Sequence, residues 1–595
     1  MKTNRMKNLL CLGGMGVAIV MLSLEFVGCG TKEMPTTDVI RFNQVGFYPM
    51  EAKTAVIYGD SVGNRPFLVR NTDNGEVVYK GISSAPRGSD FSPVKTSVLS
   101  FDVLNRAGTY RIEVTDVGQS HPFVVGENIL QDLSKSTLKA FYLQRASMPI
   151  EEQYAGEYAR PLGHPDDHVL IHPSAVSPGR PVNAVISSPK GWYDAGDYNK
   201  YIVNSGFTVG MLLALYEDYP EAVRNLKVNI PESSNQTPDL LDEAFWNIDW
   251  MLTMQDPADG GVYHKLTTPN FEGFVKPTDC KQPRYVVEKS VTAALDFAAS
   301  LAQAARIYDD YAADYPGLSE KLLSAAKRAY QWAQKHPEAY YMQNQMNEKY
   351  DPDVATGTYG DRRASDEFFW AAVELYITTH DETYLKAIEQ YFPAAYTLPT
   401  WGGIGGLGYL TLIRYQDSED AKIKPWAERA AQHLQAYAEK TIDGADATAY
   451  AASYGRSARD FFWGCNSERA AGQGITFLYA WRQSTDKKYL TAALNNMDYL
   501  LGRNATGYCY ITGAGFKSPM YPHHRLAGSD DIVNPLPGFL VGGPNPGRQD
   551  GAEYPSDIPD EAYADVEGSY ASNEIAINWQ GSFVCFVTAL AAALS

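Results

Sequence analysis

Residues 288–335 read EKSVTAALDFAASLAQAARIYDDYAADYPGLSEKLLSAAKRAYQWAQK, and this stretch decides the fold class. Apolar residues recur with a helical period over 288–311, and the same period returns over 318–335. This spacing puts the apolar side chains on one face of an α-helix. Two such helices joined by a short break predict an antiparallel helical hairpin.

The helical period begins near Asn128 and continues toward the C-terminus. About twelve patterns of this kind make about six hairpins; those not yet named lie at 130–147, 204–218, 237–255, 363–379, 382–394, 406–415, 421–440, 466–483, 487–503 and 572–594. An open solenoid usually carries a repeating sequence, and none accompanies these helices. We therefore predict a mainly α chain in which residues 128–595 form a closed ring of helical hairpins, an (α/α) barrel.

Residues 38–126 follow a different pattern, with short strand-like runs between Gly, Asn, Asp and Pro turns. The predicted strands are Val39–Phe42, Ala52–Tyr58, Pro66–Arg70, Val77–Lys80, Val94–Phe101, Tyr110–Thr115 and Pro122–Val125. About seven strands in about 90 residues indicate a small β-sandwich. Because its strands show few exposed aromatic residues, we expect it to buttress the helical domain rather than to bind carbohydrate.

Residues 1–28 have the layout of a lipoprotein signal peptide, in which basic residues precede an apolar run over 9–24. The residues before Cys29 resemble a lipobox, so Cys29 is expected to carry a lipid and to begin the mature chain. Residues 29–37 are short and polar, which is typical of a tether. We expect an exported, membrane-anchored lipoprotein facing the periplasm or the cell surface; an ordinary secretory signal or an uncleaved anchor is the alternative.

The composition limits the partners. The 595 residues include 51 basic and 70 acidic side chains, a net charge of −19, which argues against a nucleic-acid partner because such a partner needs a clustered positive surface. Outside the signal, the cysteines are scattered with no paired spacing, which argues against disulfides and a cysteine-built zinc site; they are Cys280, Cys465, Cys509 and Cys585. We expect a monomer.

Two long stretches, 149–203 and 504–571, lack helical character, and loops longer than about 15 residues inside a compact domain are usually functional. The first contains Asp194-Ala-Gly196-Asp197, where the glycine allows a tight turn that aims both carboxylates at one point. Near the end of the second, Glu574 is expected in the first turn of the last helix, after a cap at Ser572 or Asn573.

These residue types suit glycoside hydrolysis, which needs one carboxylic acid to protonate the leaving oxygen and one carboxylate to activate water or attack directly. A third segment, 515–525, supplies the imidazole of His523 and the guanidinium of Arg525, which could bind sugar hydroxyls. Aromatic side chains nearby could stack on sugar faces.

Three of these segments resemble the signatures of glycoside hydrolase family 9, and they occur in that family's order. They are the Asp-Ala-Gly-Asp turn, the Gly-x-Lys-x4-Pro-His-x-Arg stretch of 515–525, and the Tyr-x-Asp-x4-Tyr-x3-Glu-x-Ala stretch of 563–576. Residues 39–47 are similar to the start of the immunoglobulin-like module that precedes many catalytic domains of the family. The resemblance covers nearly all of 38–595.

The resemblance implies an (α/α)6 barrel, hydrolysis of internal β-1,4-glucosidic bonds in β-glucans with inversion, and no catalytic cofactor. It implies that Asp197 is the general base, Asp194 its partner in holding the water, and Glu574 the general acid. The residues expected to bind or support the substrate are His523, Arg525, Asp565, Trp463, Tyr198 and Tyr570. His524 is expected to be structural, and Trp401 either lines the cleft or packs.

As a general acid, Glu574 must stay protonated near neutral pH. We expect burial and the charges of Asp194 and Asp197 to raise its pKa, against the opposing effect of a helix N-terminus.

Metal sites are the least defined part of the resemblance. Relatives often hold zinc before the Asp-Ala-Gly-Asp turn, but residues 145–189 contain no cysteine, and prolines beside His164 and His172 argue against a helix that would align their imidazoles, so no metal ligand is predicted there. Relatives also hold structural calcium near the position of Asp366 and Glu367; two acids that simply favour a helix N-terminus are the alternative.

The sequence is also compatible with two other functions. The chain could be an exo-acting enzyme of the same family, or a glycan-binding lipoprotein without activity, although a pure binder needs no acid and base pair. The preferred glucan could be cellulose, a mixed-linkage glucan or a xyloglucan. The tryptophans at helical spacing are expected in the core, namely Trp246, Trp250, Trp332, Trp370 and Trp481.

Overall fold

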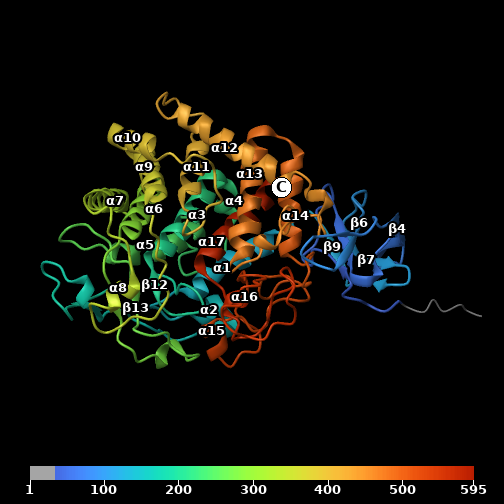
Figure 1. Cartoon of the computed structure of the whole chain (residues 1–595), viewed down its shortest axis with the longest axis horizontal. Helices are drawn as coiled ribbons and strands as arrows, with labels where there is room; N and C mark the ends of the chain where they lie inside the picture. Colours follow the sequence, from blue (N-terminus) through green and yellow to red (C-terminus); the bar gives the residue numbers. More distant parts are fainter. Residues whose placement is uncertain (1–33) are drawn as a thin grey trace, which may run out of the picture. The chain divides into compact units, whose positions relative to one another are not determined.

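The computed structural model describes residues 34–595 (Figure 1), of which Thr36–Ser595 form one unit. The predicted signal peptide, Cys29 and the start of the predicted tether lie outside the described residues. Within the described part, no helix has both the length and the apolar character needed to cross a membrane.

The N-terminal β-sandwich consists of two antiparallel sheets. One has the order β1-β2-β6-β5, and the other has the order β4-β3-β7-β8 with β9 paired to β7. The strands are β1 (Ile40–Arg41), β2 (Thr54–Tyr58), β3 (Pro66–Asn71), β4 (Val77–Ile82), β5 (Arg87–Gly88), β6 (Lys95–Ser100), β7 (Gly108–Val114), β8 (Gly118–Gln119) and β9 (Phe123–Val125). The predicted strands are all present; β5 and β8 were missed because each has two residues, too few to show a period.

Buried and partly exposed side chains alternate along the strands, and the buried ones form the core of this module. On β7, the side chains of Tyr110, Ile112 and Val114 are buried while their neighbours are partly exposed. Phe123 packs edge-on against Phe47, with ring centroids 5.4 Å apart. The module therefore has its own apolar core.

The helical domain is a ring of inner helices, each connected to outer helices. The inner helices are α3 (Ile202–Asp218), α6 (Val291–Tyr308), α9 (Ser365–Thr379), α11 (Gly405–Arg414), α13 (Gly472–Ser484) and α17 (Ile577–Ala593); the outer helices are α1 (Gln131–Gln144), α5 (Asp239–Thr253), α7 (Leu318–Lys335), α10 (Glu382–Tyr391), α12 (Lys424–Ile442) and α14 (Lys487–Leu500). Inner helices are apolar nearly all round, as α6 is, whereas α7 keeps a polar outer face.

The inner helices contact one another in order around the ring. α3 lies against α6 and α17, α6 against α9, α9 against α11, and α13 against α17. The ring closes between α11 and α13 through α12, which contacts both, and through Arg414, whose Nη2 donates to the Tyr479 hydroxyl at 2.8 Å. The predicted (α/α)6 barrel behind an immunoglobulin-like module is confirmed.

Short elements lie between these helices, and they were not predicted except for the π-helix, which lies within the helical pattern predicted at 466–483. They are α2 (Glu152–Ala155), α4 (Pro220–Asn225), α8 (Gln343–Asn347), α15 (Arg525–Ser529), α16 (Tyr570–Asn573), a π-helix (Asn466–Ala471) and a sheet with the order β11 (Val185–Ile186), β10 (Val169–Ile171), β14 (Tyr285–Val286), β13 (Lys265–Thr267), β12 (Lys200–Tyr201). Strands of two or three residues leave no sequence period. This sheet packs the loops that precede α3 and α6.

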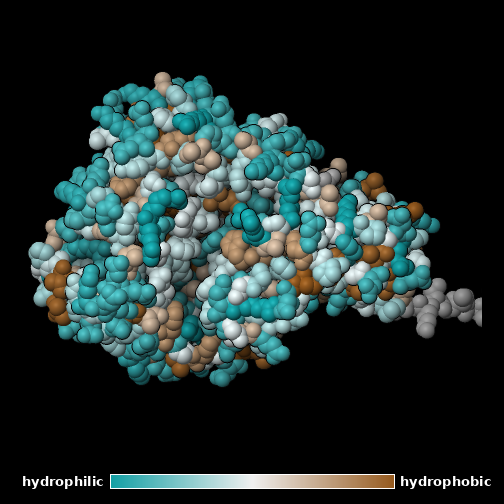
Figure 2. Space-filling view, in the orientation of Figure 1, coloured by the Kyte–Doolittle hydropathy of each residue, from teal (hydrophilic) through white to brown (hydrophobic). Residues whose placement is uncertain are grey.

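The predicted core tryptophans fall into two groups. Trp250, Trp332 and Trp370 are buried, whereas Trp246 and Trp481 are partly buried and pack against the core cluster. The visible face of the molecule is mostly hydrophilic, with hydrophobic residues in scattered patches (Figure 2), in keeping with the net charge of −19.

The module is hydrogen-bonded to the helical domain by a few specific side chains. Gln44 accepts from the backbone N–H groups of Phe516 and Lys517 at 3.0 and 2.9 Å, and its Nε2 donates to the Gly507 carbonyl at 2.9 Å. Asn43 donates to the buried carboxylate of Asp498 at 2.8 Å. These contacts agree with the expected buttress.

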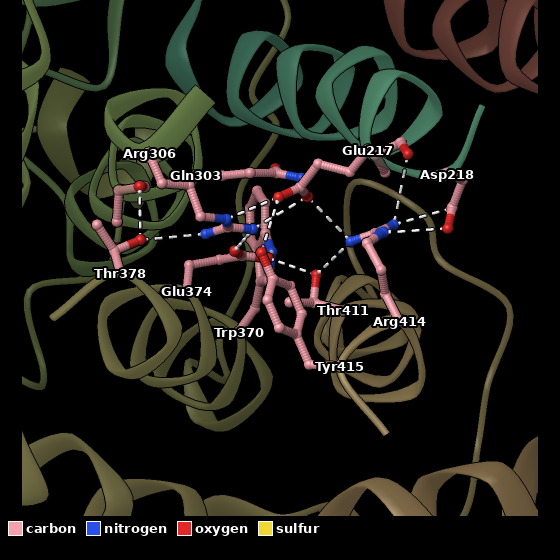
Figure 3. Close-up of polar contacts among 12 residues, drawn as sticks. Glu217, Asp218, Gln303, Arg306, Trp370, Glu374, Thr378, Thr411, Arg414 and Tyr415 are labelled. Atoms are coloured by element: carbon pink, nitrogen blue, oxygen red, sulfur yellow. Dashed lines mark hydrogen bonds and ion pairs between the residues drawn. The ribbon is translucent and has the colours of Figure 1, made fainter. Parts of the chain in front are cut away.

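A network of buried charges joins the C-terminal ends of the inner helices (Figure 3). Arg306 on α6 forms ion pairs of 2.7 Å with Glu217 on α3 and with Glu374 on α9. Arg414 on α11 pairs with Glu217 and Asp218 at 3.1 and 2.9 Å. The arginines lie near the negative ends of the helix dipoles, where positive charge is stabilised.

Candidate active site

The candidate site forms where the inner helices begin. Asp197 precedes α3, Tyr359 precedes α9, Trp401 precedes α11, Trp463 precedes the π-helix that leads into α13, and Glu574 precedes α17. The charge network of Figure 3 joins the C-terminal ends of these helices, so their N-terminal ends meet at the opposite end of the barrel. Loops far apart in sequence therefore converge on one place.

Backbone hydrogen bonds tie the three predicted motifs together. The Ile577 N–H donates to the Asp194 carbonyl at 2.8 Å, and the Arg525 N–H donates to the Gly196 carbonyl at 3.0 Å. Residues His523 and Glu574 form a parallel β-bridge. The Asp-Ala-Gly-Asp turn, the 515–525 stretch and the 563–576 stretch thus form one rigid unit.

Asp194 is buried, with 1% of its surface exposed, and both of its carboxylate oxygens are occupied. Oδ1 accepts from Asn204 Nδ2 at 2.9 Å, and Oδ2 accepts from the Tyr359 hydroxyl at 2.7 Å. Burial, and then the charge of Asp197, raises the pKa of Asp194, while its two donors oppose that rise.

Asp197 is held on one oxygen. Its Oδ2 accepts from Asn199 Nδ2 at 2.6 Å and from the Tyr201 hydroxyl at 3.1 Å. Among the residues that the structure describes, no side chain or backbone group donates to its Oδ1. One oxygen of this carboxylate is thus free to receive a proton from another molecule.

Glu574 lies outside the last helix, which corrects the sequence prediction. The structure starts that helix at Ile577, and Glu574 follows the short helix α16 with extended backbone angles of φ −79° and ψ 156°. The β-bridge to His523 and a second bridge between Ala195 and Ala576 hold this segment extended. Pairing with distant chain segments, which the local period does not reveal, moved the helix start.

The carboxyl of Glu574 touches the turn that carries the two aspartates. Its Oε1 accepts from the Gly196 N–H at 3.3 Å. Burial, followed by the charge of Asp197, raises the pKa of Glu574 well above its usual range, while Arg525 opposes the rise. The predicted direction of this shift is confirmed, and burial is its largest cause.

Gly196 is required by this close approach. A Cβ at this position would lie 2.2 Å from the His523 carbonyl oxygen and 3.1 Å from Glu574 Oε1. No side chain larger than hydrogen fits without moving the chain.

A row of rings runs beside Glu574. The Trp463 ring is 39% exposed and lies 5.2 Å from the Tyr570 ring, whose centroid is 5.7 Å from the His523 ring. His523 also packs edge-on against Phe274 at 5.3 Å, and its Nδ1 contacts the Glu567 carbonyl at 2.7 Å. Trp463, Tyr570 and His523 are thus brought together as expected, next to the carboxyl of Glu574.

Two other predicted residues hold the backbone of the site. Arg525 is mostly buried and donates to the carbonyls of Gly196 and Glu272 at 2.9 and 2.7 Å. Asp565 accepts from the Met520 N–H at 2.9 Å and from Asn573 Nδ2 at 3.0 Å. Their observed partners make Asp565 a support for the segment before Glu574, and Arg525 a brace between two loops.

Tyr198 is not placed to bind a sugar, which corrects the prediction for it. Only 3% of its surface is exposed, and its hydroxyl donates to the Val275 carbonyl at 2.8 Å. Its ring packs 4.9 Å from that of Tyr193. The side chain of Tyr198 therefore packs in the core. His524, as expected, is structural: it is buried and contacts Gln144 Oε1 through Nε2 at 2.9 Å.

Sequence reasoning missed Tyr359, Tyr201 and Asn204, which position the two aspartates. Tyr359 lies 165 residues from its partner Asp194, so no local spacing connects them. Its φ of 40°, uncommon for a residue with a side chain, has no signature in the sequence. Trp401 packs edge-on against Tyr359 at 5.2 Å and is partly buried, so it both packs and borders the site.

The imidazoles of His164 and His172 are hydrogen-bonded to protein groups. His164 Nδ1 contacts the Tyr193 hydroxyl at 2.9 Å, and His172 contacts Ser174 and the Pro352 carbonyl. Over residues 34–595, no group of three or more His, Cys, Asp and Glu side chains is arranged to hold a metal ion. Asp366 and Glu367 do lie in the first turn of α9, as predicted.

Two sequence families match this chain. The glycosyl hydrolase family 9 model covers residues 131–587, and a model described as the cellulase N-terminal ig-like domain covers 35–119. The chain belongs to glycosyl hydrolase family 9. This family 9 enzyme is therefore a glycosidase, and enzymes of the family need no cofactor for catalysis.

Relatives of this family 9 enzyme include two bacterial glucanases. It is 53% identical over 572 residues to a xyloglucan-specific endo-β-1,4-glucanase of Bacteroides ovatus, a match that covers 96% of this chain and 97% of the relative. It is 34% identical over 552 residues to endoglucanase D of Acetivibrio thermocellus, covering 92% of this chain and 82% of the relative.

Solved structures agree with this assignment. A structure described as Bacteroides ovatus GH9 superposes with a TM-score of 0.90 at 51% identity, covering 94% of this chain and all of the solved chain. A metagenome-derived family 9 endoglucanase superposes with a TM-score of 0.84 at 30% identity, covering 93% of this chain and 99% of the solved chain.

Proposed function

We propose that this family 9 enzyme hydrolyses internal β-1,4-glucosidic bonds in xyloglucan by inversion. The observation that carries the substrate is the 53% identity, over 96% of this chain, to a xyloglucan-specific endo-β-1,4-glucanase. The more distant endoglucanase D supports the bond type and the internal mode of cleavage. Other β-1,4-glucans, such as cellulose and mixed-linkage glucan, would share the same backbone linkage.

We assign the general base to Asp197 and its partner to Asp194. Because Oδ1 of Asp197 has no protein donor among the described residues, it is free to accept a proton from a water molecule. As the water oxygen bonds to the anomeric carbon, its proton passes to Asp197. Asp194, fixed at both oxygens, helps to orient the same water.

We assign the general acid to Glu574. Its raised pKa keeps it protonated at the pH where Asp197 must be ionised, which is the division of roles that an acid and base pair needs. Glu574 gives its proton to the glycosidic oxygen as the bond to the anomeric carbon breaks. The water attacks from the opposite face, so the new reducing end has the α configuration.

The rings beside Glu574 supply binding surface. An exposed indole such as Trp463 offers a flat apolar face to a sugar ring, and Tyr570 and His523 extend this row toward the acid. We propose that the glucan backbone lies along these rings.

Cleavage of xyloglucan tests this function. Reducing ends and viscosity should be followed on xyloglucan, carboxymethyl cellulose and a mixed-linkage glucan, with Asp197→Asn and Glu574→Gln as variants. We expect a rapid fall in viscosity on xyloglucan, large oligosaccharide products, and a loss of at least about 100-fold in each variant. Release of single sugars without a fall in viscosity would favour an exo-acting enzyme, and tight binding without turnover would favour a glycan receptor.

We further propose that the chain is exported and held on a membrane by a lipid at Cys29. The support is the sequence of residues 1–28 and the residues before Cys29. Expression in a bacterium with radioactive palmitate should label the wild-type chain, and Cys29→Ala should remove the label and release the enzyme from membranes. Light scattering on the soluble form should show a monomer.

A structural calcium is proposed at the start of α9. Both carboxylate oxygens of Asp296, Oδ1 of Asp366 and Oε2 of Glu367 are buried without hydrogen-bond partners. In addition to burial, the charge of Asp366 raises the pKa of both Asp296 and Glu367, and the charge of Asp296 raises that of Glu367, so a cation would relieve their repulsion. Because the described residues hold no preformed metal group, the ion would have to draw them together. Calcium should raise the unfolding temperature of the wild type but not of Asp366→Asn.

A further inference from the structure

Lys265 on β13 is a fully buried lysine next to the candidate base. Its Nζ donates to Gln343 Oε1 at 2.7 Å, Thr356 Oγ1 at 2.9 Å and the Gly357 carbonyl at 2.6 Å. Burial lowers the pKa of Lys265, and the charge of Asp197 opposes that shift. Whether this lysine is charged can be decided by counting the protons in its hydrogen bonds.

Two of its three partners can only accept. The Gly357 carbonyl has no proton to give. The amide of Gln343 is oriented by its own Nε2, which donates to the Thr356 carbonyl at 3.0 Å, so its oxygen is the atom that faces Lys265. Both contacts therefore use protons from Nζ.

The third partner also accepts. Thr267 uses its hydroxyl proton on the Thr268 carbonyl at 2.9 Å, so the contact of 2.6 Å between Thr267 and Thr356 takes its proton from Thr356. Because Thr356 gives its hydroxyl proton to Thr267, its Oγ1 can only accept a hydrogen bond from Lys265 Nζ. Three acceptors require three protons on Nζ, and only an ammonium carries three.

The chain segment to which Lys265 is hydrogen-bonded leads directly to the site. Thr356 and Gly357 precede Tyr359, whose hydroxyl donates to Asp194 Oδ2 at 2.7 Å. Nζ also lies 5.5 Å from the centroid of the Tyr201 ring, and the Tyr201 hydroxyl donates to Asp197. Asp194 is therefore held by Tyr359, which lies in the segment bound by Lys265. Asp197 is held by Tyr201, whose ring lies beside Lys265.

We propose that Lys265 is a positioning residue whose ammonium fixes residues 356–359 against the site and whose positive charge, beside the ring of Tyr201, offsets the negative charge of Asp197. The inference rests on the proposed function, because it assumes that this pair activates water. Two adjacent carboxylates repel each other, and a nearby cation reduces that repulsion.

Other charged or titratable groups also face this pair and the lysine. His264, beside Lys265 on β13, has its pKa lowered to about 3 by burial and is neutral. Arg525 is a second cation at the turn; it donates to the Gly196 carbonyl at 2.9 Å, and its charge opposes the rise that burial causes in the pKa of Glu574. His523 also faces Asp197, and burial lowers its pKa. Tyrosines with raised pKa values and the acid itself face them as well, namely Tyr201, Tyr341, Tyr359 and Glu574.

Lys265→Met tests the proposal through the pH profile. Removing the ammonium takes a positive charge away from the carboxylates that activate water, so we expect the acidic limb of kcat/KM to move to higher pH by about one unit. We expect kcat at neutral pH to fall by about 10-fold or more with little change in KM, since no sugar contact is lost. Lys265→Arg keeps the charge and should leave the acidic limb near its wild-type position.

Lys53 provides a matched control. It is also buried, and its Nζ donates to backbone carbonyls of Tyr48, Pro49 and Glu51, but it lies in the β-sandwich. Lys53→Met should lower the unfolding temperature without moving the acidic limb. An unmoved limb in folded Lys265→Met, or an equal shift in both variants, would overturn the proposal.

A second variant covers the case in which Lys265→Met does not fold. Thr356→Val removes one acceptor and leaves the charge in place, so we expect a several-fold loss of kcat with an unmoved acidic limb. Wild-type kcat in Thr356→Val would overturn the bracing role. Failure of the proposed function would look different, because the wild type itself would not turn over any β-1,4-glucan.

Discussion

The hydroxyl of Tyr359 donates a hydrogen bond of 2.7 Å to Oδ2 of Asp194, across 165 residues of sequence. Together with the bond of 2.9 Å from Asn204 to Oδ1, it fixes both oxygens of that carboxylate. Asp197, in contrast, is held at one oxygen only. The two aspartates of one turn are therefore unequal, with one fixed and the other open to a water.

Tyr359→Phe removes the hydroxyl and keeps the ring against Trp401. Asp194 would lose one of its two donors, so its orientation toward the water would loosen. We expect kcat on xyloglucan to fall by about 10-fold or more, with KM nearly unchanged. Steady-state kinetics measure both constants. Tyr350→Phe, at a tyrosine that is 37% exposed, serves as the control, and an equal loss in both variants would argue against a specific role for Tyr359.

Gly196→Ala tests the close packing of the three motifs. The new methyl group would lie 2.2 Å from the His523 carbonyl oxygen, so the turn and the segment before Glu574 must separate. We expect a loss of about 1–3 kcal/mol in the free energy of unfolding, together with a larger loss of activity. Gly273→Ala is the matched control, because nothing lies within 4 Å of a Cβ at that position. Wild-type stability and activity in Gly196→Ala would contradict the structure.

The charge network at the far end of the barrel should carry stability and no catalysis. Arg306→Met would leave Glu217 and Glu374 buried without their shared partner, which should cost about 3–5 kcal/mol of unfolding free energy. Arg224→Met removes an exposed ion pair with Glu221 and should change stability by less than about 1 kcal/mol. Chemical denaturation compares them. Equal effects would mean that the buried network adds nothing beyond an exposed pair.

Glu574→Gln should show how the raised pKa of Glu574 affects stability. A carboxyl whose pKa is raised in the folded state binds its proton more tightly there than in the unfolded chain. Folding stability is therefore full below the unfolded pKa and falls as the pH rises toward the folded pKa. Glutamine stays neutral at every pH. We expect the variant to have a higher unfolding temperature than the wild type near pH 7, with a difference that shrinks toward pH 4.

Glu221→Gln is the control for this pH dependence, since the side chain of Glu221 is 84% exposed. Its unfolding temperature should follow that of the wild type across the same range. A difference between Glu574→Gln and the wild type that stays constant with pH would show that titration of Glu574 is not its cause.

Much of this architecture follows from the sequence, because long helices and alternating strands carry strong periods. The pattern over 318–335 matches α7 at both ends, and the strand predicted at Pro66–Arg70 is β3 with one residue added. The resemblance likewise identified Asp194, Asp197 and Glu574 as neighbours, and the structure brings their segments together. Local signals of this kind depend on residues close in sequence.

What the sequence did not reveal depends on distant contacts. The start of α17 moved to Ile577 because Glu574 and Ala576 pair with remote segments. Tyr198 looked available to a sugar, yet its hydroxyl is used by Val275, whose position only the fold defines. Tyr359 and Lys265 reach the site from other loops and have no motif of their own.

In the proposed reaction, Asp197 directs a water to the anomeric carbon while Glu574 protonates the leaving oxygen. Proton NMR of the first products from xyloglucan tests it most directly, because the anomeric signal appears before mutarotation mixes the two forms. We expect α-anomer first from the wild type, and no product signal from Asp197→Asn over the same interval. Early β-anomer would mean retention through a covalent intermediate, and it would contradict the assigned roles of both carboxyl groups.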